Sequence, residues 1–187
     1  MLREEILDSA QTLLTEKGYA AMSMDDLAAQ VGISKPTLYS HFATKDDLVA
    51  AAAVRGMDRL LAVIETRPEE QSPLQHLVLV LRTMVQYQID KGTMAMRTWT
   101  PEIFRVLCMH QDAAERLQRI NTAIGSLIQV GIERGEIDPA LDPATVMMAF
   151  HGLVGALHHT RFRNTAPDLN SVADTLAAIF ERGIRAP

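Results

Sequence analysis

The sequence contains a single cysteine, Cys108, among 187 residues. One thiol excludes an intramolecular disulfide framework and a zinc site of the CxxC type. Long apolar runs are also missing, so no segment reaches the length needed to span a bilayer. Charged residues interrupt the N-terminus from Arg3 onward, which is unlike a signal peptide. We therefore expect a cytoplasmic protein with no membrane partner.

The motifs that organise common active sites are absent as well. There is no Gly-rich phosphate loop, no GxSxG elbow and no HExxH helix. Histidine, aspartate, glutamate and serine all occur, but no spacing groups them into a catalytic constellation. We expect no enzymatic activity and no cofactor.

Basic residues are scarce at the N-terminal end. Residues 1–48 hold four lysines and arginines against eight aspartates and glutamates, a net charge of −4. A DNA-binding domain is expected to be basic, so this charge alone favours a protein-interaction module. The whole chain is 48% hydrophobic and 22% charged, which is enough for one sizeable helical core or two small linked ones.

Residues 23–42, SMDDLAAQVGISKPTLYSHF, nevertheless form two short helix patterns joined by a turn. Ser23 can cap the first helix, and Gly32 stands where a helix commonly ends in a left-handed residue. Ser34 can cap the second helix, with Pro36 in its first turn, where a missing amide hydrogen costs nothing. This spacing predicts a helix-turn-helix whose second helix enters the major groove.

The second helix keeps its apolar residues on one side. Leu38 and Phe42 face inward at i, i+4, which leaves a polar outer face. Thr44 then caps a third segment, with Asp46 and Asp47 in its first turn. Most acids of residues 1–48, which we call the head, are expected in such first turns or on the far face of the first helix. Lys35 and Lys45 then remain on the groove side.

The run S-K-P-T-L-Y-S-H-F, followed by T-K-D-D-L, resembles the tetracycline-repressor (TetR) family of regulators. The resemblance implies an all-α fold of about nine helices: an N-terminal three-helix DNA-binding domain, residues 1–48, and a C-terminal domain, residues 49–187, for effector binding and dimerisation. It also implies a homodimer, most simply a repressor, that leaves an inverted-repeat operator when a small apolar effector binds.

Residue chemistry and the resemblance together nominate the contacts to operator DNA. Pro36 and Thr37 suit a thymine methyl, and Lys35 suits guanine if it points into the groove. Phosphate contacts are expected from side chains around the motif. Met22 departs from the hydroxyl residue common beside Ser23 in the family. The predicted DNA-binding residues are Ser23, Lys35, Pro36, Thr37, Tyr39, Ser40, His41 and Lys45.

Helix signals punctuate the remaining chain. We expect helices over about 46–64, 72–91, 101–107, 112–134, 144–161 and 169–182. The helix over 144–161 is apolar nearly all round, which indicates that it is covered on every side, by a second subunit or within one monomer. The family places its dimer interface on the last two helices. The candidates there are Phe150, Gly152, Leu153, Gly155, Leu157, Leu176 and Phe180.

Ten methionines suggest an adaptable apolar pocket, although methionine at helical spacing is also ordinary core. The pocket candidates are Met84, Tyr87, Trp99, Phe104, Met147 and Phe150. Cys108 with His110, or His151 with His158 and His159, are spaced poorly for one metal ion. We predict no metal site. A metal- or thiol-responsive regulator, or an interaction module that never binds DNA, stays the alternative.

Overall fold

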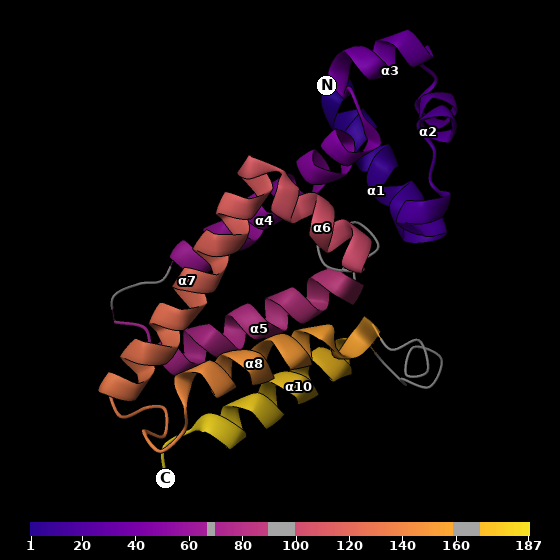
Figure 1. Cartoon of the computed structure of the whole chain (residues 1–187). Coiled ribbons are helices and arrows are strands. Elements are labelled where there is room, and N and C mark those ends of the chain that lie inside the picture. The colour runs from indigo at the N-terminus through magenta and orange to yellow at the C-terminus, as the bar shows by residue number, and fades with distance from the viewer. Residues whose placement is uncertain (67–69, 90–99, 159–168) are drawn as a thin grey trace. The chain divides into compact units, whose positions relative to one another are not determined.

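The computed structural model describes residues 1–66, 70–89, 100–158 and 169–187. Within these ranges it contains nine α-helices, one short 3-10 helix and no strand (Figure 1). The predicted all-α class and helix number are confirmed. In the same ranges, no helix is both long enough and apolar enough to cross a membrane.

Two compact units share the chain, and both are discontinuous in sequence. The first comprises Met1–Asp58 and Asp90–Leu117, and the second comprises Arg59–Ile89 and Gln118–Pro187. The first unit holds α1 (Leu2–Ala21), α2 (Met24–Val31), α3 (Lys35–His41), most of α4 (Lys45–Glu65), α6 (Pro101–Met109) and the start of α7 (Gln111–Glu133).

The core of the first unit is built from one apolar stripe per helix. The α1 helix buries Ile6, Leu7 and Leu14 completely or nearly so, which is the stripe that its sequence spacing predicts. Leu27 of α2 and Leu38 of α3 are also fully buried. Burial of these side chains fixes the orientation of α2 and α3, and thereby decides which residues of α3 are left outside.

The α1 helix continues past the residues that predict its end. Lys17-Gly18-Tyr19 predicts the end of the helix, yet α1 continues to Ala21. Gly18 itself leaves helical geometry at φ 76°, ψ 168°, so the helix is kinked there rather than ended. A positive φ is a conformation that glycine adopts at little cost, and the amide of Met22 still reaches the Gly18 carbonyl at 3.1 Å.

The second unit holds the rest of α4 and α7 with three helices that lie side by side in Figure 1. Leu77, Leu81 and Met84 of α5 are buried, as the predicted stripe requires. Phe150 and Phe180 pack edge to face with their ring centroids 5.7 Å apart, which joins α8 to α10. The elements are α5 (Pro73–Ile89), α8 (Pro143–Val154), the 3-10 helix η1 (Gly155–His158) and α10 (Leu169–Ile184).

The loop after α7 contacts the start of α5 and the end of α10. Gly135 ends the helix at φ 70°, as its position predicts. The Glu136 carboxylate accepts hydrogen bonds from the Ser72 hydroxyl at 2.5 Å and from the Leu74 amide at 3.1 Å, so it caps α5 together with Ser72. Ile137 forms an isolated antiparallel bridge with Arg185 at the end of α10.

Two predicted helix ends differ from the structure or fall outside it. The helix predicted over 144–161 is α-helical only to Val154 and then tightens to 3-10 geometry at Gly155. Gly155 has a low helix propensity, which is consistent with this change. The predicted end of α5 at Lys91-Gly92 lies outside the described residues.

Candidate nucleic-acid interface and C-terminal sites

The segment from α2 to α3 has the capping pattern that its sequence predicts. The Ser23 hydroxyl accepts the Asp26 amide at 3.0 Å, and the Ser34 hydroxyl accepts the Thr37 amide at 3.2 Å. Gly32 ends α2 in the left-handed region at φ 76°. Caps at both helix starts and a glycine between them hold α2 and α3 in a tight, defined turn.

The outer face of α3 carries most of the predicted DNA contacts. Lys35, Pro36, Ser40 and His41 are exposed, and the Tyr39 side chain is 47% exposed although it is aromatic. Thr37 is half-buried beside the Ser34 hydroxyl. The α3 helix therefore presents one continuous polar and aromatic surface, with Leu38 buried behind it.

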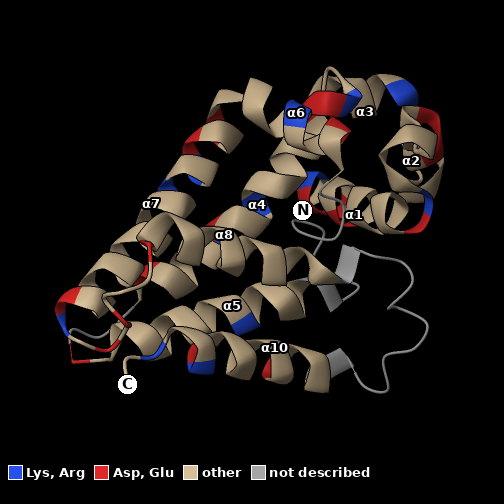
Figure 2. Cartoon of the chain, turned by 60° about the horizontal axis from the view of Figure 1, so that its bottom comes forward, with Lys and Arg blue, Asp and Glu red and all other residues tan. Residues whose placement is uncertain are grey.

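Lys35 is paired within the head. Its ammonium lies 2.6 Å from the carboxylate of Asp25 on α2, and both side chains are 59% exposed. The hydrogen bond to Asp25 raises the pKa of Lys35 above its usual value. Figure 2 marks the acidic residues of α2 in red and the basic residue of α3 in blue on the ribbon. Free Lys35 would be available to DNA, whereas paired Lys35 is partly neutralised.

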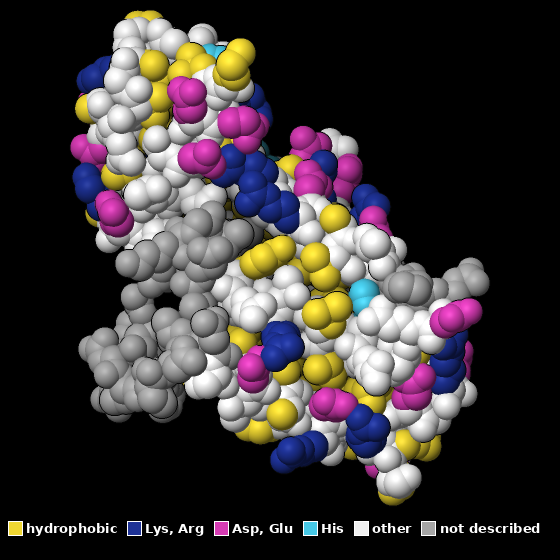
Figure 3. All heavy atoms as spheres, turned by 180° about the vertical axis from the view of Figure 1, so that it is seen from behind, with side chains coloured by type: hydrophobic (Ala, Val, Ile, Leu, Met, Phe, Trp, Pro, Cys, Tyr) yellow, Lys and Arg dark blue, Asp and Glu magenta, His cyan; other side chains and the backbone are white. Residues whose placement is uncertain are grey.

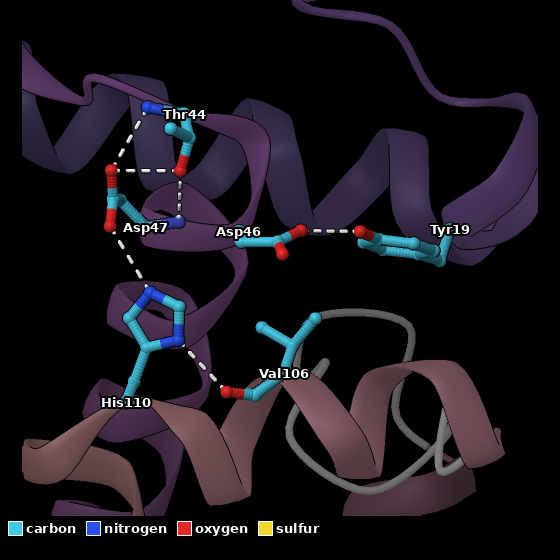
Figure 4. A network of polar contacts seen from close by, with 6 residues as sticks. All are labelled: Tyr19, Thr44, Asp46, Asp47, Val106 and His110. Atoms are coloured by element: carbon cyan, nitrogen blue, oxygen red, sulfur yellow. Dashed lines mark hydrogen bonds and ion pairs between the residues drawn. The ribbon is translucent and has the colours of Figure 1, made fainter.

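Lys45 lies at the first position of α4, with its ammonium group against an aromatic ring. Its Nζ atom is 4.2 Å from the centroid of the Tyr19 ring, a cation–π contact. The Tyr19 hydroxyl donates to the Asp46 carboxylate (Figure 4). This bond raises the pKa of Tyr19, with a further contribution from burial, and burial lowers the pKa of Lys45. Lys45 is thus held at the start of α4 by a residue of α1.

The acids of the head are distributed as the sequence predicts. Six of the eight stand in the first turns of α1, α2 and α4, where a negative charge complements the helix dipole. Asp26 also pairs with Lys17 at 2.9 Å, and this hydrogen bond lowers the pKa of Asp26. The negative charge of the head is therefore not concentrated on the exposed face of α3.

An arginine that the sequence did not single out fastens α4 to α1. Arg55 is only 17% exposed and contacts Glu4 at 2.9 Å, Asp8 at 2.8 Å and the Gln11 side-chain oxygen at 3.0 Å. Gln11 is itself buried. The three α1 residues fall at three- and four-residue spacing, which is a signal that could have identified the cluster, but their partner is 44 or more residues away.

The histidine and cysteine of the alternative metal site point to different surroundings. Cys108 is exposed, whereas both ring nitrogens of His110 are engaged, by the Val106 carbonyl and by the Asp47 carboxylate. Among the described residues, no three histidine, cysteine, aspartate or glutamate side chains are grouped to hold a metal ion. His159 lies outside the described residues.

The candidate pocket residues do not share one environment. Met84 and Phe150 are fully buried in the second unit, and Tyr87 and Met147 are half-buried there. Phe104 belongs to α6 in the first unit and is 47% exposed. Trp99 lies outside the described residues. Met84, Tyr87, Met147 and Phe150 therefore share the second unit, whereas Phe104 does not.

An apolar groove of about 550 Å³ runs between α8 and α10 in the second unit. The interface candidates Gly152, Leu153 and Phe180 line it, together with Ile179. Gly155 and Leu176 are half-buried, and Phe150 is fully buried within its own subunit. The side chain of Leu157 lies outside the described part of the chain. Hydrophobic side chains also reach the surface on the face shown in Figure 3. Leu79, Met148 and Ile179 are among the exposed apolar residues of the chain.

Comparison with known proteins assigns the N-terminal segment. Residues 6–52 match the family model described as bacterial regulatory proteins, tetR family. The HTH-type transcriptional activator FasR of Mycolicibacterium smegmatis is 38% identical over 60 residues, which are 32% of this chain and 27% of that protein. The family model thus covers α1 to the first part of α4.

Two solved structures extend the similarity of fold over nearly the whole chain. FadR from Bacillus subtilis, in complex with stearoyl-CoA, is 20% identical with a TM-score of 0.74 and covers 97% of this chain and 99% of its own. AibR, in complex with isovaleryl coenzyme A and operator DNA, is 21% identical with a TM-score of 0.73 and covers 96% and 97%. At these identities the likeness concerns the fold.

Proposed function

Because the chain belongs to the tetR family of bacterial regulatory proteins, we propose that it is a homodimeric repressor that binds inverted-repeat operator DNA and releases it when a small effector binds. Residues 1–48 are the DNA-reading head, and residues 49–187 bind the effector and the second subunit. A regulator of this kind acts in the cytoplasm, where the chromosome lies.

One observation carries the DNA-binding proposal: a capped α2–turn–α3 unit with an exposed polar face on α3. A helix held this way fits the major groove, while neighbouring side chains and helix N-termini contact phosphates. The proposed contacts are Ser23, Lys35, Pro36, Thr37, Tyr39, Ser40, His41 and Lys45. The acidic head implies modest non-specific affinity and a steep loss of binding with salt.

The test begins with selection of a binding site from a randomised duplex library. Fluorescence anisotropy then compares the selected duplex with a scrambled one at two salt concentrations. We expect specific binding that survives the higher salt, and its loss on combined Tyr39→Ala and His41→Ala substitution with the dimer intact. Thr12→Ala, an exposed change on α1, is the matched control. Equal, weak binding to both duplexes contradicts the proposal.

Dimerisation through α8 and α10 is supported by the apolar groove between them and by the exposure of Met148 and Ile179. Exposed apolar side chains around an apolar groove are typical of a surface that another chain covers. A two-fold symmetric dimer presents two α3 helices, and successive major grooves on one face of the duplex lie about 34 Å apart. An inverted-repeat operator follows from that symmetry.

For the effector we propose an acyl-coenzyme A thioester. Two proteins with the same fold are described with stearoyl-CoA and isovaleryl coenzyme A. The candidate pocket residues Met84, Tyr87, Met147 and Phe150 belong to the second unit and offer the apolar, adaptable surroundings that an acyl chain needs.

The effector proposal is tested by titrating the anisotropy complex with isovaleryl-CoA, stearoyl-CoA and free coenzyme A. We expect an acyl-CoA to release the duplex, because a ligand shifts the equilibrium toward the state that it binds better. Coenzyme A alone is the control for the nucleotide part. An unchanged complex with every thioester contradicts this class of effector. Transcription in vitro from a promoter that carries the selected site then distinguishes repression from activation.

A further inference from the structure

His110, at the end of α6, makes two hydrogen bonds through the same ring. Its Nδ1 atom lies 2.8 Å from the Val106 carbonyl oxygen, one turn back in α6. Its Nε2 atom lies 3.1 Å from Oδ1 of Asp47, near the start of α4. Figure 4 shows the imidazole ring between these two oxygens. All three residues belong to the first unit.

The two partners define the charge of the ring. A backbone carbonyl and an ionised carboxylate only accept hydrogen bonds, so both ring nitrogens must donate. Neutral imidazole has one N–H, whereas imidazolium has two. Both contacts are therefore hydrogen bonds at the same time only when His110 is protonated. A cation at the C-terminal end of α6 is also favoured by the helix dipole.

Asp47 also forms hydrogen bonds with Thr44 at the start of α4, and these connect the His110 ring to the DNA-reading head. Its Oδ2 atom accepts the Thr44 amide at 2.9 Å and the Thr44 hydroxyl at 2.8 Å, while the Thr44 hydroxyl accepts the Asp47 amide at 3.0 Å. This reciprocal pair of hydrogen bonds is a capping box, and it defines where α4 begins. Thr44 is three residues after the end of α3, and Lys45 follows it directly.

We propose that His110 is a positioning residue for operator binding: its protonated ring holds Asp47, and through Asp47 the start of α4 and the end of α3, in the geometry that binds DNA. The inference rests on the proposed function. Deprotonation removes one of the two N–H donors. It also leaves the Asp47 carboxylate without its positive partner beside Lys45, a proposed phosphate contact. Both effects weaken DNA binding, so affinity decreases as pH rises.

The direction of the pKa shifts agrees with this geometry. The Val106 carbonyl, and then the Asp47 carboxylate, raise the pKa of His110, against an opposing effect of burial. Hydrogen bonds from Thr44 first and His110 second lower the pKa of Asp47. A raised histidine pKa stabilises the folded protein below the ordinary value of about 6.5, and this contribution is lost as pH rises through the folded value.

Other charged groups surround the ring. His110 and Asp47 line a hollow of about 630 Å³ in the first unit, and the His110 side chain is 27% exposed, so solvent protons reach it. His41 is a second histidine in the hollow, and it stays in every variant compared below. The charged and titratable groups that line the same hollow or act on the charge of His110 are Arg3 and Glu4 of α1, His41 of α3, Asp46, Asp47, Arg55 and Asp58 of α4, and Asp112 of α7.

The experiment compares the full-length wild type with His110→Gln between pH 5.5 and 8.5, at constant salt. The selected duplex is titrated by anisotropy, and ¹⁵N NMR follows the imidazole nitrogens. We expect wild-type affinity to fall about five-fold or more relative to the variant across the range, so that the ratio of wild-type to variant affinity decreases as pH rises. His110 should titrate above 6.5, with both nitrogens protonated at the acid end. Asp47→Asn should lower that pKa.

The outcomes separate the two proposals. If no duplex is bound specifically at any pH, the proposed function falls and the positioning role falls with it. If specific binding is found but the ratio of wild-type to variant affinity does not change with pH, only the inference is overturned. An ordinary His110 pKa, or a neutral ring at the acid end, overturns it too. Thermal unfolding of both proteins over the same range shows whether His110→Gln is folded.

Discussion

Lys35 and Asp25 show how single charges matter on the acidic head. An exposed pair of this kind contributes little to stability, because solvent screens both charges. Its effect on binding is different, since Asp25 neutralises one of the few basic side chains of α3. Asp25 therefore limits how much non-specific affinity the head can gain from Lys35.

We expect Asp25→Asn to strengthen binding to random duplex DNA and to steepen the slope of log affinity against log salt by about 1 per subunit, because freed Lys35 then neutralises a phosphate. The measurement is anisotropy over a salt series. Asp26→Asn is the matched control: it removes the same charge one residue away but frees Lys17 instead. Equal slopes for both variants would mean that net charge alone is responsible.

Several of the residue-level expectations came directly from local chemistry. The caps at Ser23, Ser34 and Thr44 were predicted and confirmed, because a cap involves residues two or three positions apart. The left-handed Gly32 is another such case. The contacts of Arg55 with α1 and of His110 with Asp47 were missed, since these partners are 44 or more residues away in the chain. Short-range patterns do not contain that information.

At the scale of elements, the attachment of α4 to α1 depends on Arg55. We expect Arg55→Ala to lower the free energy of unfolding by about 1–3 kcal/mol, because the oxygen of buried Gln11 loses its donor and two acids lose their partner. Urea denaturation measures this. Arg59→Ala, one turn further along α4 and exposed, should change stability by less than about 0.5 kcal/mol. A comparable loss in both variants would contradict the role of the cluster.

The α7 helix offers a test of close packing. A Cβ atom added at Gly131 would lie 2.6 Å from Cδ1 and 2.9 Å from Cγ1 of Ile137, whose side chain is fully buried. We expect Gly131→Ala to destabilise the protein by about 1 kcal/mol, because overpacking outweighs the gain in helix propensity.

The control for Gly131 is another glycine in the same helix. At Gly125 the added Cβ meets only the terminal methyl of Met147, at 3.6 Å, which is ordinary contact. Gly125→Ala should therefore be neutral or stabilising by up to about 1 kcal/mol. Thermal denaturation of the pair decides the matter. Stabilisation by both alanines would show that the Ile137 side chain moves away from residue 131 with no loss of stability.

For the whole molecule, the groove between α8 and α10 predicts the oligomeric state. Ile179 lines the groove and is 56% exposed in the single chain. We expect Ile179→Asp to convert the proposed dimer to a monomer in sedimentation equilibrium, because a charge buried without a partner in the interface is costly. Leu79→Asp is the control on α5, since Leu79 is exposed to a similar extent, 41%, and does not line the groove.

Both variants staying dimeric would place the interface elsewhere. A monomeric Ile179→Asp protein should also lose most of its operator affinity, because each subunit then binds one half-site alone.

Helix number, the three-helix head and most element bounds were predictable, since each depends on local periodicity and caps. The division of the chain into units was not, because it depends on which distant stripes cover one another.

The first unit has a consequence for protein engineering, because it includes α6 and the start of α7 as well as the reading helices. Val106 and Leu107 are fully buried in that unit, yet they are encoded more than 60 positions after the end of α3. A chimera that joins only the first 58 residues to a foreign sensor would lack the part of this core that α6 and α7 supply. Transplanting the specificity of this regulator requires grafting the exposed face of α3 rather than exchanging the N-terminal segment.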